Sequence, residues 1–349
     1  MSDFCSNFAR KILLHEKYYY LLRAIGFMRK SVFVLAVMCA AMIMPVAAQE
    51  NVQSAQRETY QFAQKDTCAL YLDIHRPAPG VATSIDSVAK PTIVYMFGGG
   101  FISGKRDAGY MLPFYKTLTD HGYTVVAIDY RLGMKGYKMG KGWIGLAKSV
   151  KPFYHAQQMG VEDVFSAIAY LAAHPELGID VNNIVLSGSS AGAIISLASA
   201  YAVTNGEAEG LPEGFKLKGV MSFAGAIIST HGAPKFKELP CPILFFHGLD
   251  DNAVAYKHVG AFGLGMWGSS YYAAKLKKKG GNYSIYRYKD RAHDVAAYTN
   301  LLWTEEEAFL EKNVMKGLRC VVDALVDDPT LPVFKEWSQM TPQQMYHGE

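Results

Sequence analysis

Short apolar runs alternate with longer amphipathic stretches along most of this chain of 349 residues. Short apolar runs bounded by glycine, proline or polar residues are typical of buried strands, and the longer stretches are typical of helices. A chain that alternates the two predicts an α/β fold, a mostly parallel sheet with helices on both faces. We expect strands near residues 69–75, 91–97, 123–129, 183–187, 217–223, 241–247 and 283–289, and helices near 108–121, 161–174, 190–203, 268–280 and 304–326.

Two segments depart from this rhythm. Leu132 to Gly160 links a strand to a helix with far more residues than such a link needs, and long loops in a compact domain are usually functional or disordered. The segment from Ala261 to Tyr272 is rich in glycine and aromatic residues. Both are candidates for the walls of a substrate pocket, with ordinary packing as the alternative. Their large side chains are Tyr137, Trp143, Phe153, Tyr154 and His155 in the first segment, and Phe262, Met266 and Trp267 in the second.

The last predicted helix has a candidate start signal. Thr304 stands three residues before Glu307, which is the spacing of a capping box. We therefore expect this helix to begin at Thr304.

The most specific pattern lies between Asn183 and Gly192. An apolar run leads directly into the sequence Gly-Ser-Ser-Ala-Gly, residues 188–192, and small residues follow. A Gly-x-Ser-x-Gly turn between a strand and a helix is a nucleophile elbow, in which the glycines permit a tight turn that exposes the serine hydroxyl. Close packing alone also produces such turns. The pattern makes Ser190 the candidate nucleophile and requires its partners to be found elsewhere.

Those partners occur later in the chain in the order that this chemistry needs, an acid and then a histidine. Adjacent Asp250 and Asp251 follow a buried strand, and a polar turn after the next strand carries His293. His258 follows the acidic pair too closely, and His347 lies in a polar C-terminal tail. His293 is therefore the candidate base, and the acid is one of the two aspartates.

Three consecutive glycines, residues 98–100, follow a buried strand upstream. Such a turn lets backbone N–H groups point at a substrate oxygen, as in an oxyanion hole. An alternative is that residues 99–105 begin a phosphate-binding P-loop, since they have the spacing G-x-x-x-x-G-K. The next residue is Arg106, which has no hydroxyl for Mg²⁺, and no helix pattern continues from it, so the sequence disfavours nucleotide binding.

Taken together, these motifs resemble those of the α/β-hydrolase superfamily. Within it, they are similar to secreted esterases of the hormone-sensitive-lipase, carboxylesterase and feruloyl or acetyl-xylan esterase groups. Phe97 departs from the histidine that often precedes the glycines in the hormone-sensitive-lipase group. The resemblance extends from about Leu70 to about Leu325 and rests on "YLDIHRP" (71–77), "GGGF" (98–101), "VVAIDYRLG" (125–133), "VEDVFSAIAYLAAHPELGIDVNNIVLSGSSAGA" (161–193) and "CPILFFHGLDDNAV" (241–254).

The resemblance implies roles for further residues. It implies an α/β-hydrolase fold whose oxyanion donors are the N–H groups of Gly99, Gly100 and Ala191. It favours Asp251 as the acid, because the carboxylate usually stands four residues after the histidine of His-Gly-x-x-Asp, and it leaves Asp250 as a loop charge. Four other matching positions usually support the fold in such proteins, and here they are Asp129, Tyr130, Arg131 and Asp163.

The predicted activity is hydrolysis of carboxylic esters through an acyl-enzyme on Ser190, with His293 as base and Asp251 orienting it. This chemistry needs no metal and no organic cofactor. The ester is either a small molecule or an acyl group on a plant polysaccharide. A peptidase related to prolyl oligopeptidase is an alternative that Ser189 disfavours, because an aromatic residue usually precedes the serine there. A non-catalytic binding module is the other alternative, and the presence of all three residues disfavours it.

The N-terminus resembles an export signal. Basic residues after Met28 precede an apolar run and the small residues 46–48, which predicts cleavage before Gln49. We therefore expect a leader over residues 1–48, one catalytic domain over 49–349, no membrane span after cleavage, and a periplasmic or secreted protein. A stable N-terminal anchor is the alternative, and an over-long start covering residues 1–27 stays open.

Charge and cysteine content limit the partners. The leader holds six of the 35 basic and two of the 31 acidic residues, which leaves 29 of each in the remainder. That balance indicates no nucleic-acid partner, and the run 277–279 of lysines fits a solvated helix face. Cys68, Cys241 and Cys320 cannot all pair in one molecule and do not have the spacing of a zinc site, so one disulfide stays open. The sequence does not indicate an oligomeric state.

Overall fold

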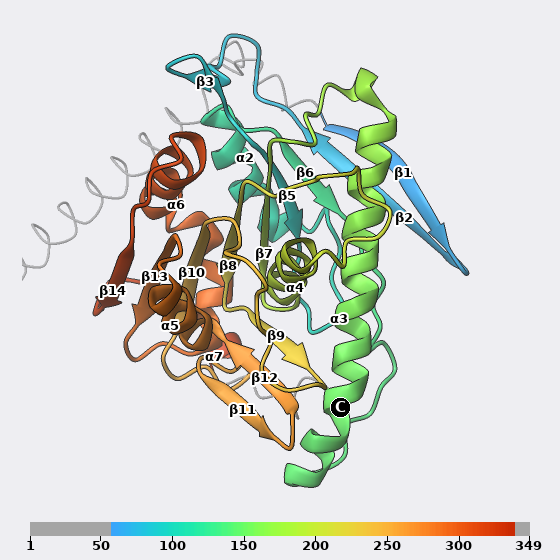
Figure 1. Ribbon diagram of the computed structural model, residues 1–349, viewed down its shortest axis with the longest axis vertical. Coiled ribbons are helices and arrows are strands. Elements are labelled where there is room, and N and C mark those ends of the chain that lie inside the picture. Colours follow the sequence, from blue (N-terminus) through green and yellow to red (C-terminus); the bar gives the residue numbers. More distant parts are fainter. Residues whose placement is uncertain (1–56, 339–349) are drawn as a thin grey trace, which may run out of the picture. The chain divides into compact units, whose positions relative to one another are not determined.

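A nine-stranded sheet forms the centre of the structure, a computed structural model in which residues 57–338 are described (Figure 1). The strand order is β1-β2-β6-β5-β7-β8-β10-β13-β14; β2 is antiparallel to both of its neighbours, and the strands from β6 to β14 are parallel. The sheet confirms the predicted α/β-hydrolase fold. Its strands are β1 (Arg57–Lys65), β2 (Cys68–His75), β5 (Thr92–Met96), β6 (Val125–Ile128), β7 (Ile184–Ser189), β8 (Gly219–Phe223), β10 (Ile243–Gly248), β13 (Tyr283–Tyr288) and β14 (Val322–Val326).

The central strands explain the continuous apolar runs in the sequence. Every residue of β5, β6, β7, β8 and β10 is buried. A parallel strand covered on both faces has no solvent side, so it shows no polar alternation. Phe246 on β10 stacks on Phe223 and Tyr286 of the two neighbouring strands, with ring centroids 4.9 and 5.4 Å away. This packing fixes the register that brings the C-terminal ends of these strands together.

The helices follow the predicted order with different bounds. In Figure 1, α3 runs beside α4, from the level of β1 and β2 to the hairpin formed by β11 and β12, and it contacts α4, β1 and β12. The elements are the helices α2 (Leu112–Asp120), α3 (Gly142–Ala173), α4 (Ala191–Asn205), α5 (Ser269–Lys279), α6 (Trp303–Phe309) and α7 (Lys335–Ser338), the 3-10 turns η2 (Gly109–Met111), η3 (Pro175–Leu177) and η4 (His293–Asn300), and the π-helical turn η5 (Leu310–Met315).

A small antiparallel sheet lies outside the central one. It has the order β11-β12-β9, and the hairpin of β11 and β12 occupies most of the glycine- and aromatic-rich segment 261–272. The sequence pattern predicted no strand there, because β11 is exposed at every position and β12 is a five-residue strand with two glycines. The strands are β9 (Ala226–Ser229), β11 (His258–Ala261) and β12 (Leu264–Gly268), and a separate short hairpin consists of β3 (Ser84–Ile85) and β4 (Val88–Ala89).

The connection between residues 132 and 160 is mostly helical, so the expectation of a long loop is wrong from Gly142 onward. α3 continues through Pro152, which cannot donate to the carbonyl of Lys148. Glycines at both ends of this stretch also lower its helix propensity. Packing against α4 and the small sheet stabilises a helix that local propensity does not favour.

The helix expected over 304–326 is shorter than predicted: α6 ends at Phe309, the π-helical turn η5 continues it to Met315, and the same range ends in the edge strand β14. Gly317, with φ of 61°, follows the helical segment and is the kind of stop signal that the prediction overlooked. The predicted capping box is also wrong. Thr304 lies inside the first turn, and the N-cap is Leu302 with no side-chain capping bond.

Three further observations concern the described residues. None of their helices combines the length and apolar character needed to cross a membrane. Cys68 is exposed, Cys241 and Cys320 are partly buried, and all three are free thiols. The predicted leader, the cleavage site before Gln49 and His347 lie outside the described residues.

Candidate active site

Ser190 occupies the sharp turn between β7 and α4. Its φ of 52° and ψ of −116° lie in a region that costs a non-glycine residue free energy, and its N–H donates to the carbonyl of Phe223 at 2.9 Å. The flanking glycines are required by close contacts. A Cβ on Gly188 would lie 2.4 Å from the carbonyl carbon of Gly192, and a Cβ on Gly192 would lie 2.1 Å from the carbonyl oxygen of Met96. The turn has the geometry of the predicted nucleophile elbow.

The structure brings Ser190, His293 and Asp251 together in a hydrogen-bonded chain. His293 Nε2 lies 2.8 Å from Ser190 Oγ, and His293 Nδ1 lies 2.8 Å from Asp251 Oδ2. Ser190 and His293 are buried, and so is Asp251. They come from the ends of β7, β10 and β13, which meet at one edge of the sheet. Asp250 is exposed and does not contact the imidazole, so Asp251 is the aspartate in this chain of contacts.

The carboxylate of Asp251 is held by four groups. Oδ1 accepts the N–H groups of Ala253 and Val254 at 2.9 and 2.8 Å, and Oδ2 is shared by His293 and, at 3.3 Å, by His247 Nε2. Burial acts to raise the pKa of Asp251, but the charge of His293 and the hydrogen bonds from both imidazoles outweigh it and hold that pKa well below its usual range. The carboxylate is therefore ionised whenever the protein is folded near neutral pH.

His247 is a site residue that the sequence did not identify as one. Its side chain is fully buried behind Asp251, with Nδ1 2.7 Å from Ser269 Oγ and Nε2 3.1 Å from the carbonyl oxygen of Val254. In the sequence, His247 is the histidine of the His-Gly-x-x-Asp pattern, from which the position of Asp251 was predicted. The spacing of four residues between His247 and Asp251 was the feature that could have indicated a contact. Only the structure shows that the two side chains meet.

Two of the three predicted oxyanion donors adjoin the nucleophile. Gly100 and Ala191 line the same cavity as Ser190, whereas Gly99 is not among the lining residues. Gly99 and Gly100 have φ of 131° and 61°, and a Cβ on Gly99 would lie 2.1 Å from the carbonyl oxygen of Ser103. The turn therefore requires glycine at both positions, while the assignment of the donors stays a prediction.

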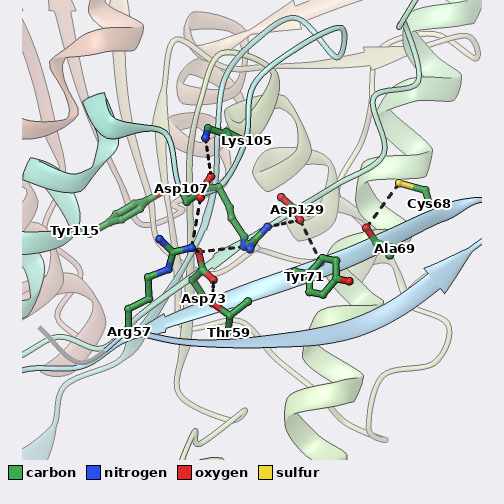
Figure 2. Close-up of polar contacts among 11 residues, drawn as sticks. Arg57, Thr59, Cys68, Ala69, Tyr71, Asp73, Lys105, Asp107, Tyr115 and Asp129 are labelled. Carbon is green, nitrogen blue, oxygen red and sulfur yellow. Dashed lines mark hydrogen bonds and ion pairs between the residues drawn. The ribbon is translucent and has the colours of Figure 1, made fainter.

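An ion-pair cluster includes Arg106, which follows this glycine turn in the chain. Arg106 Nη1 lies 2.6 Å from Asp129 Oδ2, and Arg106 Nε lies 3.1 Å from Asp73 Oδ2, which also pairs with Arg57 at 3.1 Å. Figure 2 shows the side chains of Arg57, Asp73 and Asp107 pointing toward one another. Arg106, which follows the P-loop-like lysine, is thus part of an internal network.

The remaining residues predicted to support the fold lie beside the same turn. The hydroxyl of Tyr130 donates to the carbonyl of Phe97 at 2.9 Å, and the two rings stack at 4.3 Å. Arg131 Nε lies 2.9 Å from Asp163 Oδ1, and burial raises the pKa of Asp163 to about 6 although Arg131 opposes the shift. The contact of Tyr130 fixes the start of the glycine turn, and the contact of Arg131 holds the segment that carries Tyr130.

A cavity of about 730 Å³ opens beside Ser190, between the N-terminal half of α3 and the β11–β12 hairpin. The two segments predicted as pocket walls contribute Phe153, Phe262 and Met266, but Tyr137, Tyr154, His155 and Trp267 are not among the lining residues. Apart from Ser190 the polar side chains in the lining are those of Asp251 and Asn252. The rest are glycine or apolar: Gly100, Phe101, Leu146, Ala147, Val150, Phe153, Ala191, Ile194, Ile228, Ala253, Val254, Ala255, Val259, Gly260, Ala261, Phe262, Leu264, Gly265 and Met266.

Residues 36–211 match the family model described as "Carboxylesterase family". The match spans half of the chain and includes the glycine triplet and Ser190. The chain belongs to the carboxylesterase family. Membership makes this protein a carboxylic ester hydrolase, as the sequence predicted. Asp251 and His293 lie beyond the matched residues.

Solved structures of esterase 2 from the planctomycete Thermogutta terrifontis have the same fold. The propionate-bound form has a TM-score of 0.52 and 22% identity, and the apo form has a TM-score of 0.51 and 23% identity. The form phosphonylated by cyclosarin has a TM-score of 0.52 and 23% identity. Each comparison covers 73% of this carboxylesterase and 94% of the other chain. No curated protein matches the sequence significantly.

Among the described residues of this carboxylesterase, no three His, Cys, Asp or Glu side chains are grouped so that they could hold a metal ion.

Proposed function

We propose that this carboxylesterase hydrolyses its ester through Ser190, His293 and Asp251 acting as a catalytic triad. The observation that carries the proposal is the pair of 2.8 Å contacts that link the three side chains beside the cavity. A serine hydroxyl is a weak nucleophile, so His293 Nε2 takes its proton as Ser190 Oγ attacks the ester carbonyl. Asp251 accepts the hydrogen bond from Nδ1–H, which selects the tautomer that leaves Nε2 free to act as a base.

The later steps use the same groups. The tetrahedral intermediate carries a negative charge on the former carbonyl oxygen, and the N–H groups of Gly100 and Ala191, with Gly99 as the third predicted donor, stabilise it. One such donor is commonly worth about 10²–10³ in rate. His293 then gives its proton to the leaving alcohol, and a water molecule activated by the same imidazole releases the acid from Ser190.

The cavity supports an ester with an apolar group as the substrate. Its lining is almost wholly apolar beyond the triad, and burying a hydrocarbon chain against such a surface is favourable by about 25 cal/mol per Å². A sugar hydroxyl placed there would lose its hydrogen bonds to water without finding partners. We therefore favour small-molecule esters over the acylated plant polysaccharides that export and family resemblance suggest.

Export is the second part of the proposal. The predicted leader over residues 1–48 supports a periplasmic or secreted enzyme that begins at Gln49. The test is the N-terminal mass of the protein isolated from the culture medium or periplasm. Recovery of the protein only in the cytoplasm, with its full N-terminus, would reject export.

The experiment for the catalytic proposal compares the wild type with Ser190→Ala on p-nitrophenyl acetate, butyrate and octanoate. We expect the variant to lose on the order of 10⁴-fold or more in kcat. Ser166→Ala, which removes a hydroxyl from the middle of α3, is the matched control and should retain activity. Acetylated xylan and a chromogenic peptide are assayed alongside.

The outcomes separate the possibilities. Activity that survives in Ser190→Ala would refute the triad. Turnover of acetylated xylan that exceeds turnover of all three aryl esters would favour the polysaccharide substrate, and selective cleavage of the peptide would favour a peptidase. If every substrate is inert and a fluorophosphonate does not label Ser190, a non-catalytic role is favoured.

A further inference from the structure

The two walls of the cavity carry an unusual distribution of charge. No aspartate or glutamate occurs between residues 130 and 161 or between residues 252 and 268. Within the same segments are six lysines, all exposed: Lys135, Lys138, Lys141, Lys148, Lys151 and Lys257. The chain after the predicted leader is balanced in charge. These lysines are therefore a local concentration of positive charge beside the cavity and not a sign of a basic protein.

These six lysines have no ion-pair partner within 4.0 Å among residues 57–338. Elsewhere in the described fold some basic side chains are paired and others, Lys277 and Lys278 among them, are not. Arg57, Arg106 and Arg131 each contact at least one carboxylate, and so does Lys289. The charge on the cavity walls is thus left available to an outside partner.

Helix geometry places part of this charge at the cavity mouth. Ile144, Ala147, Lys148 and Lys151 follow the spacing i, i+3, i+4, i+7 and therefore share one face of α3. Ala147 also lines the cavity. The loop before α3 is held on the same part of the helix, because the hydroxyl groups of Tyr137 and Ser149 lie 3.1 Å apart. Lysines of the loop and of the helix therefore lie on the same wall.

The other wall exposes apolar side chains instead of covering them. Phe262 lies at the turn of the β11–β12 hairpin and is fully exposed, and Val259 on β11 is 48% exposed. Across the cavity, Ile144 on α3 is 51% exposed. Figure 1 shows the N-terminal end of α3 and the hairpin at the same end of the described unit, and α3 contacts β12. Exposed apolar side chains surrounded by unpaired lysines are typical of a surface that enters a lipid headgroup region.

We propose that this lysine-rich face, formed by the six lysines with Ile144, Val259 and Phe262, docks on an anionic lipid surface. The positive charge of the unpaired lysines complements the negative charge of the lipid phosphate groups. The three apolar side chains then reach the boundary between headgroups and acyl chains. A nucleic-acid duplex would engage the lysines but would leave Phe262 and Val259 in water, and a single strand would leave Val259 and Ile144 there. The docked orientation points the mouth of the apolar cavity at the lipid.

Docking does not depend on the chemistry at Ser190. The delivery of an apolar ester from the lipid into the cavity does rest on the proposed function, whereas binding to the surface is measured without any turnover. The two proposals can therefore fail separately.

The test is co-sedimentation with vesicles of pure phosphatidylcholine and of phosphatidylcholine mixed equally with phosphatidylglycerol. The chain is used as it is isolated, with its N-terminus recorded by mass spectrometry, and every variant also carries Ser190→Ala. We expect binding to the mixed vesicles, weaker binding to the neutral ones, and loss of binding at high salt. Because a lysine near an anionic surface contributes about fivefold in affinity, Lys148→Gln with Lys151→Gln should weaken binding about 25-fold. Phe262→Ser should weaken it about tenfold or more.

Matched controls come from α5 and the surface near it. Lys277→Gln with Lys278→Gln removes the same charge from a helix that does not line the cavity, and Leu239→Ser removes an exposed apolar side chain. Both should leave vesicle binding unchanged. Circular dichroism confirms that each variant is folded.

Three results would overturn the proposal. The first is equal binding to neutral and anionic vesicles, or binding to neither. The second is an equal loss of binding in the α5 control and in the variant of Lys148 and Lys151. The third is tight binding to single-stranded RNA without binding to anionic vesicles, which would assign the lysines to a different partner.

Discussion

Glu306 should make this protein less stable as the pH rises, and replacement by glutamine should remove that effect. The side chain lies in α6, is fully buried, and has no hydrogen-bond partner for either carboxyl oxygen among residues 57–338. Burial, assisted by the charge of Glu305, raises the pKa of Glu306 well above its usual value. The carboxyl group is therefore protonated in the folded state over a pH range in which the unfolded chain has already ionised it.

The sign and size of the effect follow from linkage. Between the unfolded pKa, about 4.3, and the raised folded pKa, the folded state binds more protons, so the free energy of unfolding falls by up to about 1.4 kcal/mol per pH unit. Glu306→Gln keeps the shape and cannot ionise. Its amide is as unpartnered as the protonated acid, so the difference between the two proteins comes from ionisation alone. We expect the variant to exceed the wild type in stability at about pH 8 by about 1.4 kcal/mol for each pH unit by which the folded pKa is raised up to that pH. At about pH 4, where both side chains are neutral, the two proteins should be equally stable.

The assay is urea unfolding, followed by tryptophan fluorescence, at a series of pH values. Glu307→Gln removes the same charge from a partly exposed position on the same helix, and it corrects for the change in net charge. A glutamine variant no more stable than the wild type at the higher pH would refute the reasoning. A gain of equal size at both ends of the pH range would refute it as well, because such a gain would not come from ionisation.

Three further predictions concern the site. His247→Phe should lower kcat about tenfold with little change in KM and move the acid limb of the pH–rate profile upward. The reason is that Asp251 loses a hydrogen bond and then holds the proton of the His293 imidazole more strongly. His247→Gln should restore most of the rate, and identical pH profiles in all three proteins would contradict this role. Asp251→Asn should lower kcat about 10⁴-fold while Asp250→Asn stays within about twofold, and similar losses in both would show that the assignment of the acid is wrong. Gly192→Ala should prevent the tight turn and destabilise the fold by about 3 kcal/mol or more. Thermal unfolding compares it with Gly206→Ala, whose new Cβ would meet no atom within 4 Å and should cost about 1 kcal/mol. Equal melting temperatures of the two variants would contradict the contact argument.

The parts of the site that local chemistry determines could be predicted from the sequence. Gly188 and Gly192 flank Ser190 because the turn has no room for a Cβ at either position, and such a requirement leaves a pattern in the sequence itself. His293 could be found because it follows a buried strand in the right order. The central strands were recognisable because each is buried on both faces.

The parts that depend on tertiary contacts could not be predicted from the residues alone. Two adjacent aspartates follow β10, and which of them points inward is decided by the turn that places Asp251 over the N–H groups of Ala253 and Val254. His247 becomes a partner of Asp251 only in that turn. The first half of α3 was missed because packing, rather than propensity, makes it helical. The hairpin of β11 and β12 was missed because β11 is exposed and carries no apolar alternation, and because β12 is short and contains two glycines.

The cavity walls belong to segments that lie outside the nine-stranded sheet. The N-terminal half of α3 and the hairpin are inserted between strands, while the elbow and the chain of contacts among Ser190, His293 and Asp251 rest on the sheet itself. The architecture is thus modular, because the segments that line the cavity can be exchanged without altering the part to which we assign the chemistry. Replacement of residues 135–153 or 257–266 by segments of other lengths is accordingly a direct route to new specificities, both in evolution and in the laboratory.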